Sequence, residues 1–572
     1  MVKKQDKSDI VVIGGVAAGP KTAAVLARRL TGHKITLFQK ENRISYGTCG
    51  LPYFASGDIN SFDELTYTSY GVPRTPDFFL NSKNFEVRIL SEVLDINRTK
   101  KTVTVKNIDS GETFIHGYGK LVIATGAVPN RPPFPCPAST VVRSFTRPED
   151  AIHFRQMVQT GQIEKVVIIG GGFIGCELVE AMAGMWGIET VLVEKEPQVL
   201  PFILDREMAE RVRHEMVKKE ITVMTGAEVE KVGIGQDNRP EVHIKKHTVL
   251  SADYVFICVG VHPESSLAKE CGLKIGSTGG IEVNSRLQTS DPDIYAGGDC
   301  VEVEHFITGK KIFLPMGSLA NRHGWVIAEN ICGHKREFPG VVGSFLVKVF
   351  DLNIGTTGLS EQAAAREGLE TGSVLGSFPD KPDYYPEVKT FTLKLVFEIK
   401  SGRLLGLQAV GEGDICRRVD VFSAFLQRKA AVEDLLHFEH GYAPPYAEAL
   451  DPLHQLATMV IAQRGGTSFL KPAFDFDGFM EHNGLTDVIA LDVREPEEIE
   501  AHPWRIDGRN NVQHVNIPLN DLKKRLDELV RTREIVIMCR RGPRAYQASV
   551  ILKQAGFHKV HVIGGGAQAS LL

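Results

Sequence analysis

The chain has 572 residues, with a hydrophobic content of 43%, a charged content of 24% and a formal net charge of −4. The length predicts several domains. The near balance of charges gives no reason to expect nucleic acid or an anionic membrane surface as a partner.

Nine cysteines are scattered along the chain without paired metal-ligand spacing. This pattern predicts neither a metal site nor a disulfide framework and fits a reducing compartment. No apolar run approaches the roughly 20 residues that span a bilayer. The short, charged segment Met1–Asp9 lacks a signal-peptide core, so we expect a cytoplasmic protein.

The first predicted elements are a strand at residues 10–13, a glycine-rich turn, a helix at 21–30 and a second strand at 34–38. Glycines in such a turn let the backbone approach a pyrophosphate at the helix N-terminus, so the unit predicts a dinucleotide-binding Rossmann-like fold. Position 16, where the common pattern has its middle glycine, is Val, and Gln39 stands where an acidic residue usually binds ribose hydroxyls. The predicted cofactor-binding residues of this unit are Gly14, Gly15, Ala18, Gly19, Gln39, Lys40 and Ser45.

A single cysteine, Cys49, lies in the segment Ser45–Tyr53, where glycines flank it and Pro52 indicates the start of a helix. Backbone N–H groups and a helix dipole at such a place would lower the pKa of the thiol and favour the thiolate. We therefore expect a redox-active thiol beside an electron-carrying ring. A buried, inert cysteine is the alternative interpretation of this segment by itself.

Residues 118–127 predict a buried strand that ends in Ala-Thr-Gly, and a second βαβ unit begins with a strand at 166–169. Here all three glycines of G-x-G-x-x-G are present. The following strand, 190–193, ends at Glu194, whose carboxylate suits a ribose diol and would repel a 2′-phosphate, so NADH is predicted in preference to NADPH. The predicted cofactor-binding residues here are Thr125, Gly126, Gly170, Gly172, Phe173, Ile174, Gly175, Glu177, Glu194 and Gly260.

The next motif is Asp293–Asp299, in which Asp299 follows two glycines and suits hydrogen bonds to ribityl hydroxyls. The segment Leu314–Asn321 then predicts a helix whose N-terminus faces the electron-carrying ring. Gly298 and Ala320 complete the predicted cofactor-binding residues.

This order of motifs resembles the flavoprotein disulfide reductases with two dinucleotide domains. Ser45–Tyr53 resembles their single-cysteine members, which are the coenzyme A disulfide reductases, NADH oxidases and NADH peroxidases. The resemblance covers roughly residues 8–462 and implies FAD. Because no second cysteine follows within a few residues, Cys49 would form a mixed disulfide, a persulfide or a sulfenic acid with an external partner.

Residues 341–462 resemble the interface domain of that superfamily, which implies a homodimer. In coenzyme A disulfide reductases, tyrosines of this domain reach the active site of the partner subunit. By this resemblance Tyr384 and Tyr442 are expected to act as phenol donors to a sulfur leaving group, and an aromatic interface patch is the alternative. His437 and His440 are interpreted as surface histidines.

The last strongly apolar strand, at 534–538, ends at Cys539, and a loop with three arginines leads into a helix that runs to Leu552. Converging N–H groups, arginines and a helix N-terminus would hold a thiolate or persulfide anion. Cys539, Arg540 and Arg544 are therefore candidate catalytic residues, whereas Asp492 and Arg494 are expected to form a structural ion pair. These motifs resemble a single rhodanese domain over about residues 474–572.

The predicted fold class is α/β, with two Rossmann-like domains, an α+β dimerisation domain and a C-terminal α/β rhodanese domain. The predicted boundaries are 1–148 and 281–340 for the FAD-binding domain, 149–280 for the NAD-binding domain, 341–462 for the dimerisation domain, 463–473 for a linker and 474–572 for the rhodanese domain.

The whole chain resembles the fused coenzyme A disulfide reductase–rhodanese proteins, which include NADH-dependent persulfide and polysulfide reductases. The resemblance implies that Cys49 reduces sulfane sulfur while Cys539 captures or delivers it, and it implies coenzyme A as a ligand. Lys21, Arg28 and Arg29 are candidate cations for coenzyme A phosphates. Three alternatives stay open: a plain coenzyme A disulfide reductase, an NADH oxidase or peroxidase, and a non-catalytic redox-sensing scaffold.

Overall fold

The computed structural model describes residues 6–246, 248–471, 480, 487–504 and 512–569. Parts of the predicted N-terminal segment, linker and rhodanese domain, at 1–5, 472–479, 481–486, 505–511 and 570–572, lie outside the described residues. The chain divides into two compact units, the first formed by residues 1–195 and 227–341 and the second by residues 196–226 and 342–572. None of the helices in the described ranges is long and apolar enough to cross a bilayer.

The core of the first unit is a sheet with the strand order β3-β2-β1-β6-β5-β4, in which β17 also pairs with β6. The central strand β1 (Asp6–Ile13) runs parallel to both β2 and β6, and its residues Val11 and Val12 are fully buried. Such a continuous apolar run is typical of a strand that is covered on both faces. The other strands are β2 (Ile35–Phe38), β3 (Glu86–Arg88), β4 (Ser91–Asn97), β5 (Thr102–Asn107), β6 (Thr113–Ile123) and β17 (Ile294–Ala296).

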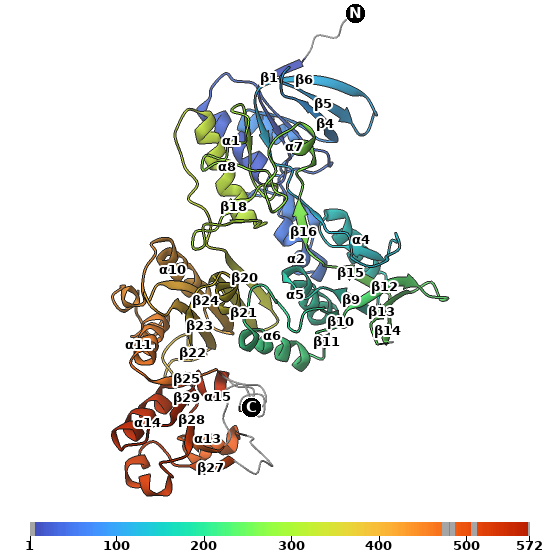
Figure 1. Cartoon of the computed structure of the whole chain (residues 1–572). Helices are drawn as coiled ribbons and strands as arrows, with labels where there is room; N and C mark the ends of the chain where they lie inside the picture. The colour runs from blue at the N-terminus through green and yellow to red at the C-terminus, as the bar shows by residue number, and fades with distance from the viewer. Residues whose placement is uncertain (1–5, 247, 472–479, 481–486, 505–511, 570–572) are drawn as a thin grey trace, which may run out of the picture. The chain divides into compact units, whose positions relative to one another are not determined.

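Helices α1 (Ala18–Arg29) and α8 (Gly317–Ile331) lie side by side in this unit (Figure 1). A Cβ atom at Gly324 would lie only 2.7 Å from the carbonyl oxygen of Ala18, so glycine allows the two helices to pack this closely. The predicted order of strand, turn, helix and strand over residues 10–38 is confirmed, with the helix beginning at Ala18.

The second parallel sheet of this unit contains β10 (Glu189–Val193), β9 (Lys165–Ile169), β15 (Tyr254–Ile257) and β8 (Val142–Ser144). Helix α5 (Phe173–Val179) follows β9 and continues into a π-helical segment at Glu180–Met185, so the second predicted βαβ unit is confirmed. The remaining elements are η1 (Thr48–Gly50), α2 (Leu51–Ser56), η2 (Phe62–Thr66), α3 (Pro76–Lys83), β7 (Ala127–Pro129), α4 (Pro148–Gln159), β12 (Val229–Ile234), β13 (Pro240–Ile244), β14 (Thr248–Ser251), β16 (Val261–Pro263), α7 (Ser266–Glu270), β18 (Val303–Glu304) and β19 (Lys311–Ile312).

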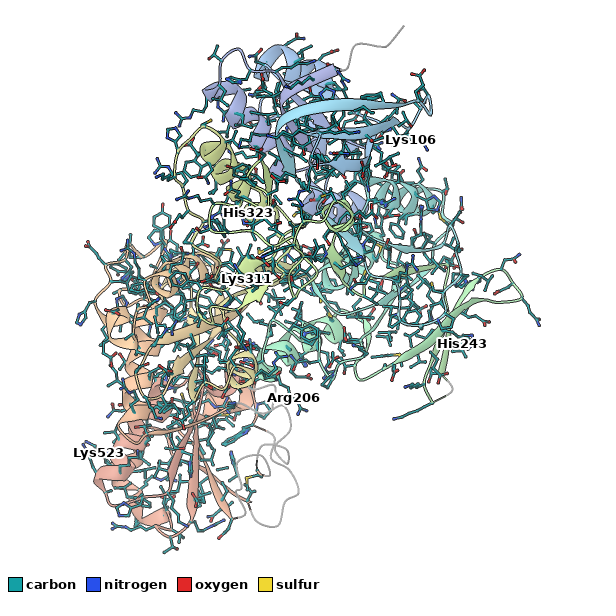
Figure 2. All side chains as sticks on the ribbon, turned by 45° about the horizontal axis from the view of Figure 1, so that its top comes forward. Lys106, Arg206, His243, Lys311, His323 and Lys523 are labelled. Atoms are coloured by element: carbon teal, nitrogen blue, oxygen red, sulfur yellow. The ribbon has the colours of Figure 1, made fainter. Side chains whose placement is uncertain are left out.

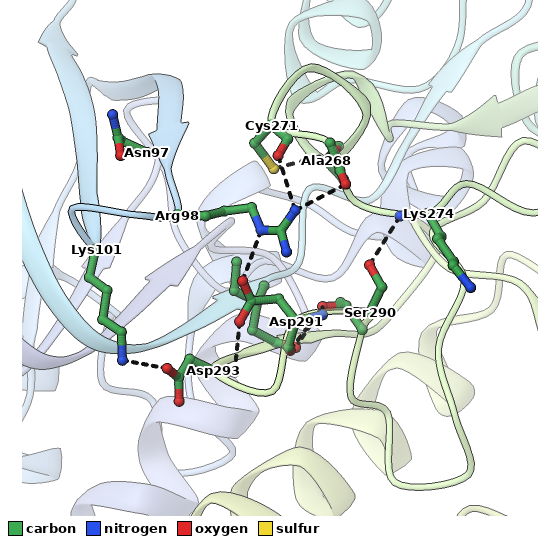
Figure 3. Close-up of polar contacts among 12 residues, drawn as sticks. Asn97, Arg98, Lys101, Ala268, Cys271, Lys274, Ser290, Asp291 and Asp293 are labelled. Atoms are coloured by element: carbon green, nitrogen blue, oxygen red, sulfur yellow. Dashed lines mark hydrogen bonds and ion pairs between the residues drawn. The ribbon is translucent and has the colours of Figure 1, made fainter.

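Polar contacts from the turn between β4 and β5 fix the segment that leads into β17 (Figure 3). The Nε atom of Arg98 donates to Asp291 at 2.8 Å, and another guanidinium nitrogen donates to the carbonyl of Gly272 at 3.0 Å. Lys101 forms an ion pair with Asp293. Because β17 ends at the Gly-Gly-Asp motif, these contacts hold the backbone that carries Asp299.

The second unit contains an antiparallel sheet with the strand order β20-β21-β24-β23-β22. Its strands are β20 (Ser344–Val349), β21 (Leu352–Gly358), β22 (Thr371–Pro379), β23 (Thr390–Glu398) and β24 (Leu404–Gly411). The other elements of this part are α6 (Arg206–Lys218), β11 (Thr222–Met224), α9 (Glu361–Arg366), α10 (Cys416–Gln427), η4 (Val432–Leu436) and α11 (Pro452–Arg464). The predicted strands near 391–399 and 404–410 and the helix near 419–427 are confirmed.

A buried lysine holds helices α6 and α9 against this sheet. The side chain of Lys394, on β23, is 1% exposed, and its Nζ atom lies 2.7 Å from Asp205, 2.5 Å from Glu207 and 2.8 Å from Glu361. Lys471 also contacts Glu361, at 2.8 Å. A buried cation is stable only when carboxylates compensate it in this way. Residues 196–226, predicted within the NAD-binding domain, thus pack with the second unit.

The last part of the second unit is a parallel sheet with the order β25-β29-β28-β26-β27. Strand β25 (Ser468–Leu470) lies within the predicted linker, and it pairs with β29 as an edge strand of this sheet. The other elements are β26 (Val488–Asp492), α13 (Pro496–Ala501), β27 (Val512–Asn516), η5 (Leu522–Lys524), η6 (Leu526–Glu528), β28 (Glu534–Met538), α14 (Pro543–Gln554), β29 (Val560–Ile563) and α15 (Gly566–Ala569).

Replacing Lys394 by Met should destabilise the second unit by about 3 kcal/mol or more, because the buried carboxylates of Asp205 and Glu207 would lose the cation that compensates them, whereas Glu361 keeps Lys471. Calorimetry should therefore show a lower unfolding temperature. Lys400→Met is the matched control, since the Lys400 side chain is 84% exposed and pairs with the exposed Glu370. The control should change stability by less than about 0.5 kcal/mol. Equal effects of the two substitutions would contradict the structural role of Lys394.

Candidate active site

Cys49 lies in the short 3₁₀ turn Thr48–Gly50, and helix α2 begins directly after it. The cysteine is exposed. A Cβ atom at Gly50 would meet the end of the Leu65 side chain, so the leucine packs directly against the turn that carries the cysteine. A Cβ atom at Gly317, the first residue of α8, would lie 3.8 Å from the Cys49 Sγ atom. The predicted helix start near 314–321 is thus confirmed, and it reaches the thiol.

The predicted lowering of the Cys49 pKa is wrong. Partial burial raises the pKa of the thiol, and the carboxylate of Glu177 raises it further. The hydrogen bond from Thr48 lowers it, and the charge of Asp299 again raises it. The physical reason is that burial of the thiol and the negative charges beside it both oppose the thiolate, whereas α2, with only six residues, has a weak dipole.

Glu177, on α5, is the acidic group with the strongest influence on this thiol. Burial raises its pKa to about 7, and the neighbouring Glu180 contributes to the shift. Glu177 also raises the pKa of the Tyr53 hydroxyl, after the effect of burial. The sequence placed Glu177 near a cofactor junction, and the fold brings it close enough to Cys49 to act on its charge.

The first glycine turn forms a cradle that only glycine fits. Gly14 has φ of +103°, and a Cβ atom there would overlap the carbonyl oxygen of Ala124. A Cβ atom at Gly19 would overlap the carbonyl oxygen of Gly14. The Gln39 side chain accepts a hydrogen bond from the Gly15 N–H at 3.0 Å. Because no side chain fills this turn, a pyrophosphate could lie close to the backbone at the N-terminus of α1.

The second glycine turn repeats this arrangement. Gly170 has φ of +109°, and a Cβ atom at Gly175 would overlap the carbonyl oxygen of Gly170. The Glu194 carboxylate accepts a hydrogen bond from the Gly171 N–H at 2.6 Å. Gln39 and Glu194, both at the end of the second strand of their units, thus bind the equivalent glycine of their turns.

Asp299 carries a buried carboxylate oxygen, Oδ1, that has no hydrogen-bond partner among the described residues. Burial raises the pKa of this carboxyl to about 6. Such an orphaned acceptor fits the hydroxyl groups of a bound polyol such as the ribityl chain of a flavin. Together with the first glycine cradle, it fits FAD.

A histidine that the sequence analysis did not select fixes the motif before Asp299. The Nδ1 atom of His323, labelled in Figure 2, accepts a hydrogen bond from the Gly298 N–H at 3.1 Å. Burial lowers the pKa of His323 to about 3, so its ring is neutral and Nδ1 is free to accept. A lone histidine on a helix gives no sequence signal for such a role.

The other predicted cofactor-binding residues lie around these turns. The Thr125 hydroxyl donates to the carbonyl of Glu264, and the Gly260 carbonyl accepts from the Asn130 N–H at 3.0 Å. Ala18, Gly298 and Ala320 pack together, because a Cβ atom at Gly298 would lie 3.2 Å and 3.7 Å from the two alanine Cβ atoms. Lys40 is exposed, and Ser45, Gly126, Gly172, Phe173 and Ile174 are half-buried.

Cys539 lies at the end of β28 and is 1% exposed. The backbone N–H of Gly542 donates to its Sγ atom at 3.0 Å, and Gly542 has φ of +122°. Arg544 binds the carboxylate of Glu498 in bidentate fashion at 2.6 and 2.7 Å.

The expectation that three arginines surround this thiol is therefore only partly correct. Glu498 engages Arg544, although the charge of Cys539 still acts on that arginine. Asp383 engages Arg541 at 2.7 Å, and Arg540 is exposed. The predicted structural ion pair is confirmed, since Arg494 and Asp492 are buried and bonded at 2.7 Å.

Tyr384 and Tyr442 are brought together by the fold, and the neighbouring Tyr442 hydroxyl raises the pKa of Tyr384. Their exposed fractions are 74% and 49%. His437 is exposed as predicted, but His440 is half-buried and its ring contacts the carbonyl of Glu448 at 3.2 Å, so its assignment as a surface residue is wrong.

A cavity of about 350 Å³ adjoins the junction of α1 and α8. It is lined by Lys21, Asn321, Arg322, Trp325, Val326, Glu337, Phe338 and Pro339. Of the predicted coenzyme A cations, Lys21 lines this cavity, Arg28 is exposed, and Arg29 instead pairs with the buried Glu329 at 3.2 Å.

Three family sequence models match the chain. The one described as pyridine nucleotide-disulphide oxidoreductase matches residues 8–316, and the dimerisation domain of the same family matches residues 344–454. The chain belongs to the pyridine nucleotide-disulphide oxidoreductase family. A rhodanese-like domain matches residues 477–570 of this oxidoreductase. The described residues contain no group of three or more His, Cys, Asp or Glu side chains that could hold a metal ion.

Known proteins resemble this oxidoreductase over most of its length. The structure of an NAD-dependent persulfide reductase from A. fulgidus matches with a TM-score of 0.91 and 39% identity over 97% of this chain and 99% of that one. The NAD(P)H coenzyme A polysulfide/persulfide reductase of Pyrococcus horikoshii is 32% identical over 79% of this chain and 98% of its own. An NADH oxidase of Methanocaldococcus jannaschii is 34% identical over 77% of this chain and 96% of its own.

Replacing Glu177 by Gln should lower the pKa of the Cys49 thiol, because a neighbouring carboxylate that opposes the thiolate is removed. The rate at which iodoacetamide alkylates Cys49, followed by mass spectrometry as a function of pH, should rise at lower pH than in the unmodified protein. Asp63→Asn, which removes an exposed carboxylate of the same unit, is the control. It should leave the pH dependence of Cys49 alkylation unchanged. An unchanged profile in Glu177→Gln would show that the carboxylate does not act on the thiol.

Proposed function

We propose that this oxidoreductase is a flavin-dependent, NADH-linked reductase of sulfane sulfur, which acts on a persulfide, a polysulfide or a coenzyme A disulfide at Cys49. The observation that carries this proposal is the exposed, lone Cys49 thiol at the N-terminus of α8, in a unit with two glycine cradles. The rhodanese-like domain and the names of the A. fulgidus and P. horikoshii proteins support it.

The two cradles would bind the two dinucleotides. Gly14, Gly19 and Asp299 would hold FAD, and the second turn, with Glu194, would hold NADH. FAD, when bound, would supply Cys49 with the two electrons that NADH delivers. The carboxylate of Glu194 at the end of its strand supports a preference for NADH over NADPH.

Cys49 would act as the nucleophile. Its thiolate attacks the outer sulfur of R–S–SH, which forms a new S–S bond in Cys49–S–SH, breaks the S–S bond of the substrate and releases R–S⁻. Two electrons then cleave the Cys49–S–SH bond to give the Cys49 thiolate and HS⁻. NADH leaves one proton for each pair of electrons, and Glu177, with a pKa of about 7, is placed to hold it.

The neighbouring phenols of Tyr384 and Tyr442 would protonate the leaving thiolate at the partner subunit's Cys49. The family's dimerisation domain and the exposure of both phenols support this role and a homodimeric assembly. Coenzyme A would use the cavity beside Lys21. The cations of Lys21 and Arg322 suit phosphates, and Trp325 offers a face on which an adenine can stack.

Cys539 would capture sulfane sulfur. Its thiolate attacks the outer sulfur of a donor such as thiosulfate, which forms Cys539–S–S⁻, breaks the S–S bond of the donor and releases sulfite. The Gly542 N–H, which already donates to Sγ, would stabilise the anion. Arg540 would offer the incoming anionic donor a solvent-exposed charge. The captured sulfur then passes to Cys49 or to a thiol carrier such as coenzyme A.

Replacing Cys49 by Ser should abolish NADH consumption with cysteine persulfide, because no thiolate remains to attack the outer sulfur. FAD should still bind, and stopped-flow absorbance should show flavin reduction by NADH at an unchanged rate. Turnover that survives the substitution would refute the assignment of Cys49.

Replacing Cys539 by Ser should lower NADH consumption with thiosulfate plus coenzyme A by at least tenfold, since loss of a nucleophile removes the capture step. Turnover of cysteine persulfide should change little, because that substrate reaches Cys49 directly. If NADH consumption were lost with both substrates, Cys539 would be required for reduction itself and not only for the delivery of sulfur.

The second candidate function is NADH oxidase chemistry, which the M. jannaschii relative favours. Here Cys49 would cycle through a sulfenic acid. Oxygen-dependent NADH consumption without any sulfur acceptor, at a rate above that with cysteine persulfide, would support this second function. A non-catalytic scaffold would bind FAD but consume little NADH with any acceptor.

A further inference from the structure

An ion pair connects the Cys539 loop to the tyrosine loop of the same chain. The guanidinium of Arg541 binds the carboxylate of Asp383 through two hydrogen bonds, at 2.7 and 3.1 Å. The Arg541 side chain is 15% exposed, and this guanidinium holds the pKa of Asp383 below its usual value. A bidentate pair of this kind fixes orientation as well as distance.

Helix α15 holds the same loop from its backbone. The N–H groups of Ala567 and Gln568 donate to the carbonyls of Cys539 and Arg540 at 2.8 and 3.0 Å. The Gln568 side chain donates to the Thr390 hydroxyl on β23 at 2.6 Å.

The carbonyl of Gln568 accepts a bond from Arg211 on α6 at 2.7 Å. The short helix thus ties the Cys539 loop to β23 of the dimerisation domain and to α6 of the same compact unit. Cys539 is therefore part of one packed body with that domain.

These contacts connect the loop that carries the Cys539 thiol with the loop that carries the Tyr384 phenol. Asp383 directly precedes Tyr384, whose phenol is close enough to Tyr442 for that hydroxyl to raise its pKa. Arg541 lies two residues after Cys539 and one residue before Gly542, whose N–H binds the sulfur. The loop that carries sulfur and the loop that carries the phenols are consequently joined by the Asp383–Arg541 pair.

We propose that Asp383 is a positioning residue for sulfur transfer, which through Arg541 holds the Cys539 loop so that captured sulfur leaves beside the tyrosine pair. This inference rests on the proposed function. In the step, an acceptor thiolate R–S⁻, such as that of coenzyme A, attacks the terminal sulfur of Cys539–S–S⁻. The bond between the two sulfurs breaks, R–S–S⁻ forms and the Cys539 thiolate is restored, without any net oxidation or reduction.

The test uses the FAD-loaded full-length protein and the variants Asp383→Asn and Arg541→Gln. Loading of Cys539 with sulfur is measured by mass spectrometry, as the gain in mass of the peptide that carries Cys539 after incubation with thiosulfate. Transfer is measured as NADH consumption with thiosulfate plus coenzyme A, and direct reduction as NADH consumption with cysteine persulfide. We expect loading and direct reduction to stay within about twofold of the unmodified protein, while transfer falls roughly tenfold or more, because misplacement of reacting groups is costly.

Two further variants make the test specific. The charge swap Asp383→Arg with Arg541→Asp should recover most of the transfer rate, since it rebuilds the pair with opposite polarity. Glu528→Gln, which breaks the exposed Arg525–Glu528 pair on the same domain, is the control and should leave all three rates unchanged. In a Cys539→Ser background, Asp383→Asn should add no further loss.

An unchanged transfer rate in Asp383→Asn would overturn the inference, as would a loss of loading equal to the loss of transfer, which would make the pair merely structural. If Cys539→Ser lowers transfer and Asp383→Asn does not, this inference alone fails. If Cys539→Ser itself leaves transfer unchanged, the proposed feeding role of Cys539 fails and the inference fails with it.

Discussion

The close approach of a helix to a strand at two glycine turns is the constraint on which the first unit depends. At Gly19 and Gly175 a single Cβ atom would overlap the carbonyl oxygen of the first glycine of the turn. Because no side chain intervenes, the N-termini of α1 and α5 lie directly at the ends of their strands, where their N–H groups would face the pyrophosphate of a bound dinucleotide. Both glycine cradles follow from that contact.

Charge compensation plays the corresponding part in the second unit. Lys394 is stable in the interior only because Asp205, Glu207 and Glu361 surround it, and these carboxylates draw α6 and α9 onto the sheet. At the surface, Asp383 and Arg541 join the loops of the dimerisation and rhodanese-like domains. Ionic contacts thus join segments of this unit that lie far apart in the sequence.

The two cysteines assigned to sulfur chemistry lie in opposite environments. Cys49 is exposed, and the carboxylates of Glu177 and Asp299 act against its thiolate. Cys539 is buried, and the Gly542 N–H donates to its sulfur. A thiol that accepts a backbone hydrogen bond suits the storage of a sulfur anion, whereas an exposed thiol suits attack on an incoming substrate.

The sequence by itself determined the order of the domains, both glycine cradles, the two cysteines and the buried Asp492–Arg494 pair, because each depends on residues close together in the chain. Local sequence does not show which distant side chains will lie near a given residue in the fold. The raised pKa of Cys49, the role of His323 and the position of β25 were therefore decided by tertiary structure. The same holds for Arg541, whose partner Asp383 lies 158 residues away in the chain. Long-range charges and buried contacts form only once the backbone is folded, and for this reason the tertiary structure alone revealed that the Cys539 loop and the tyrosine loop belong to one assembly.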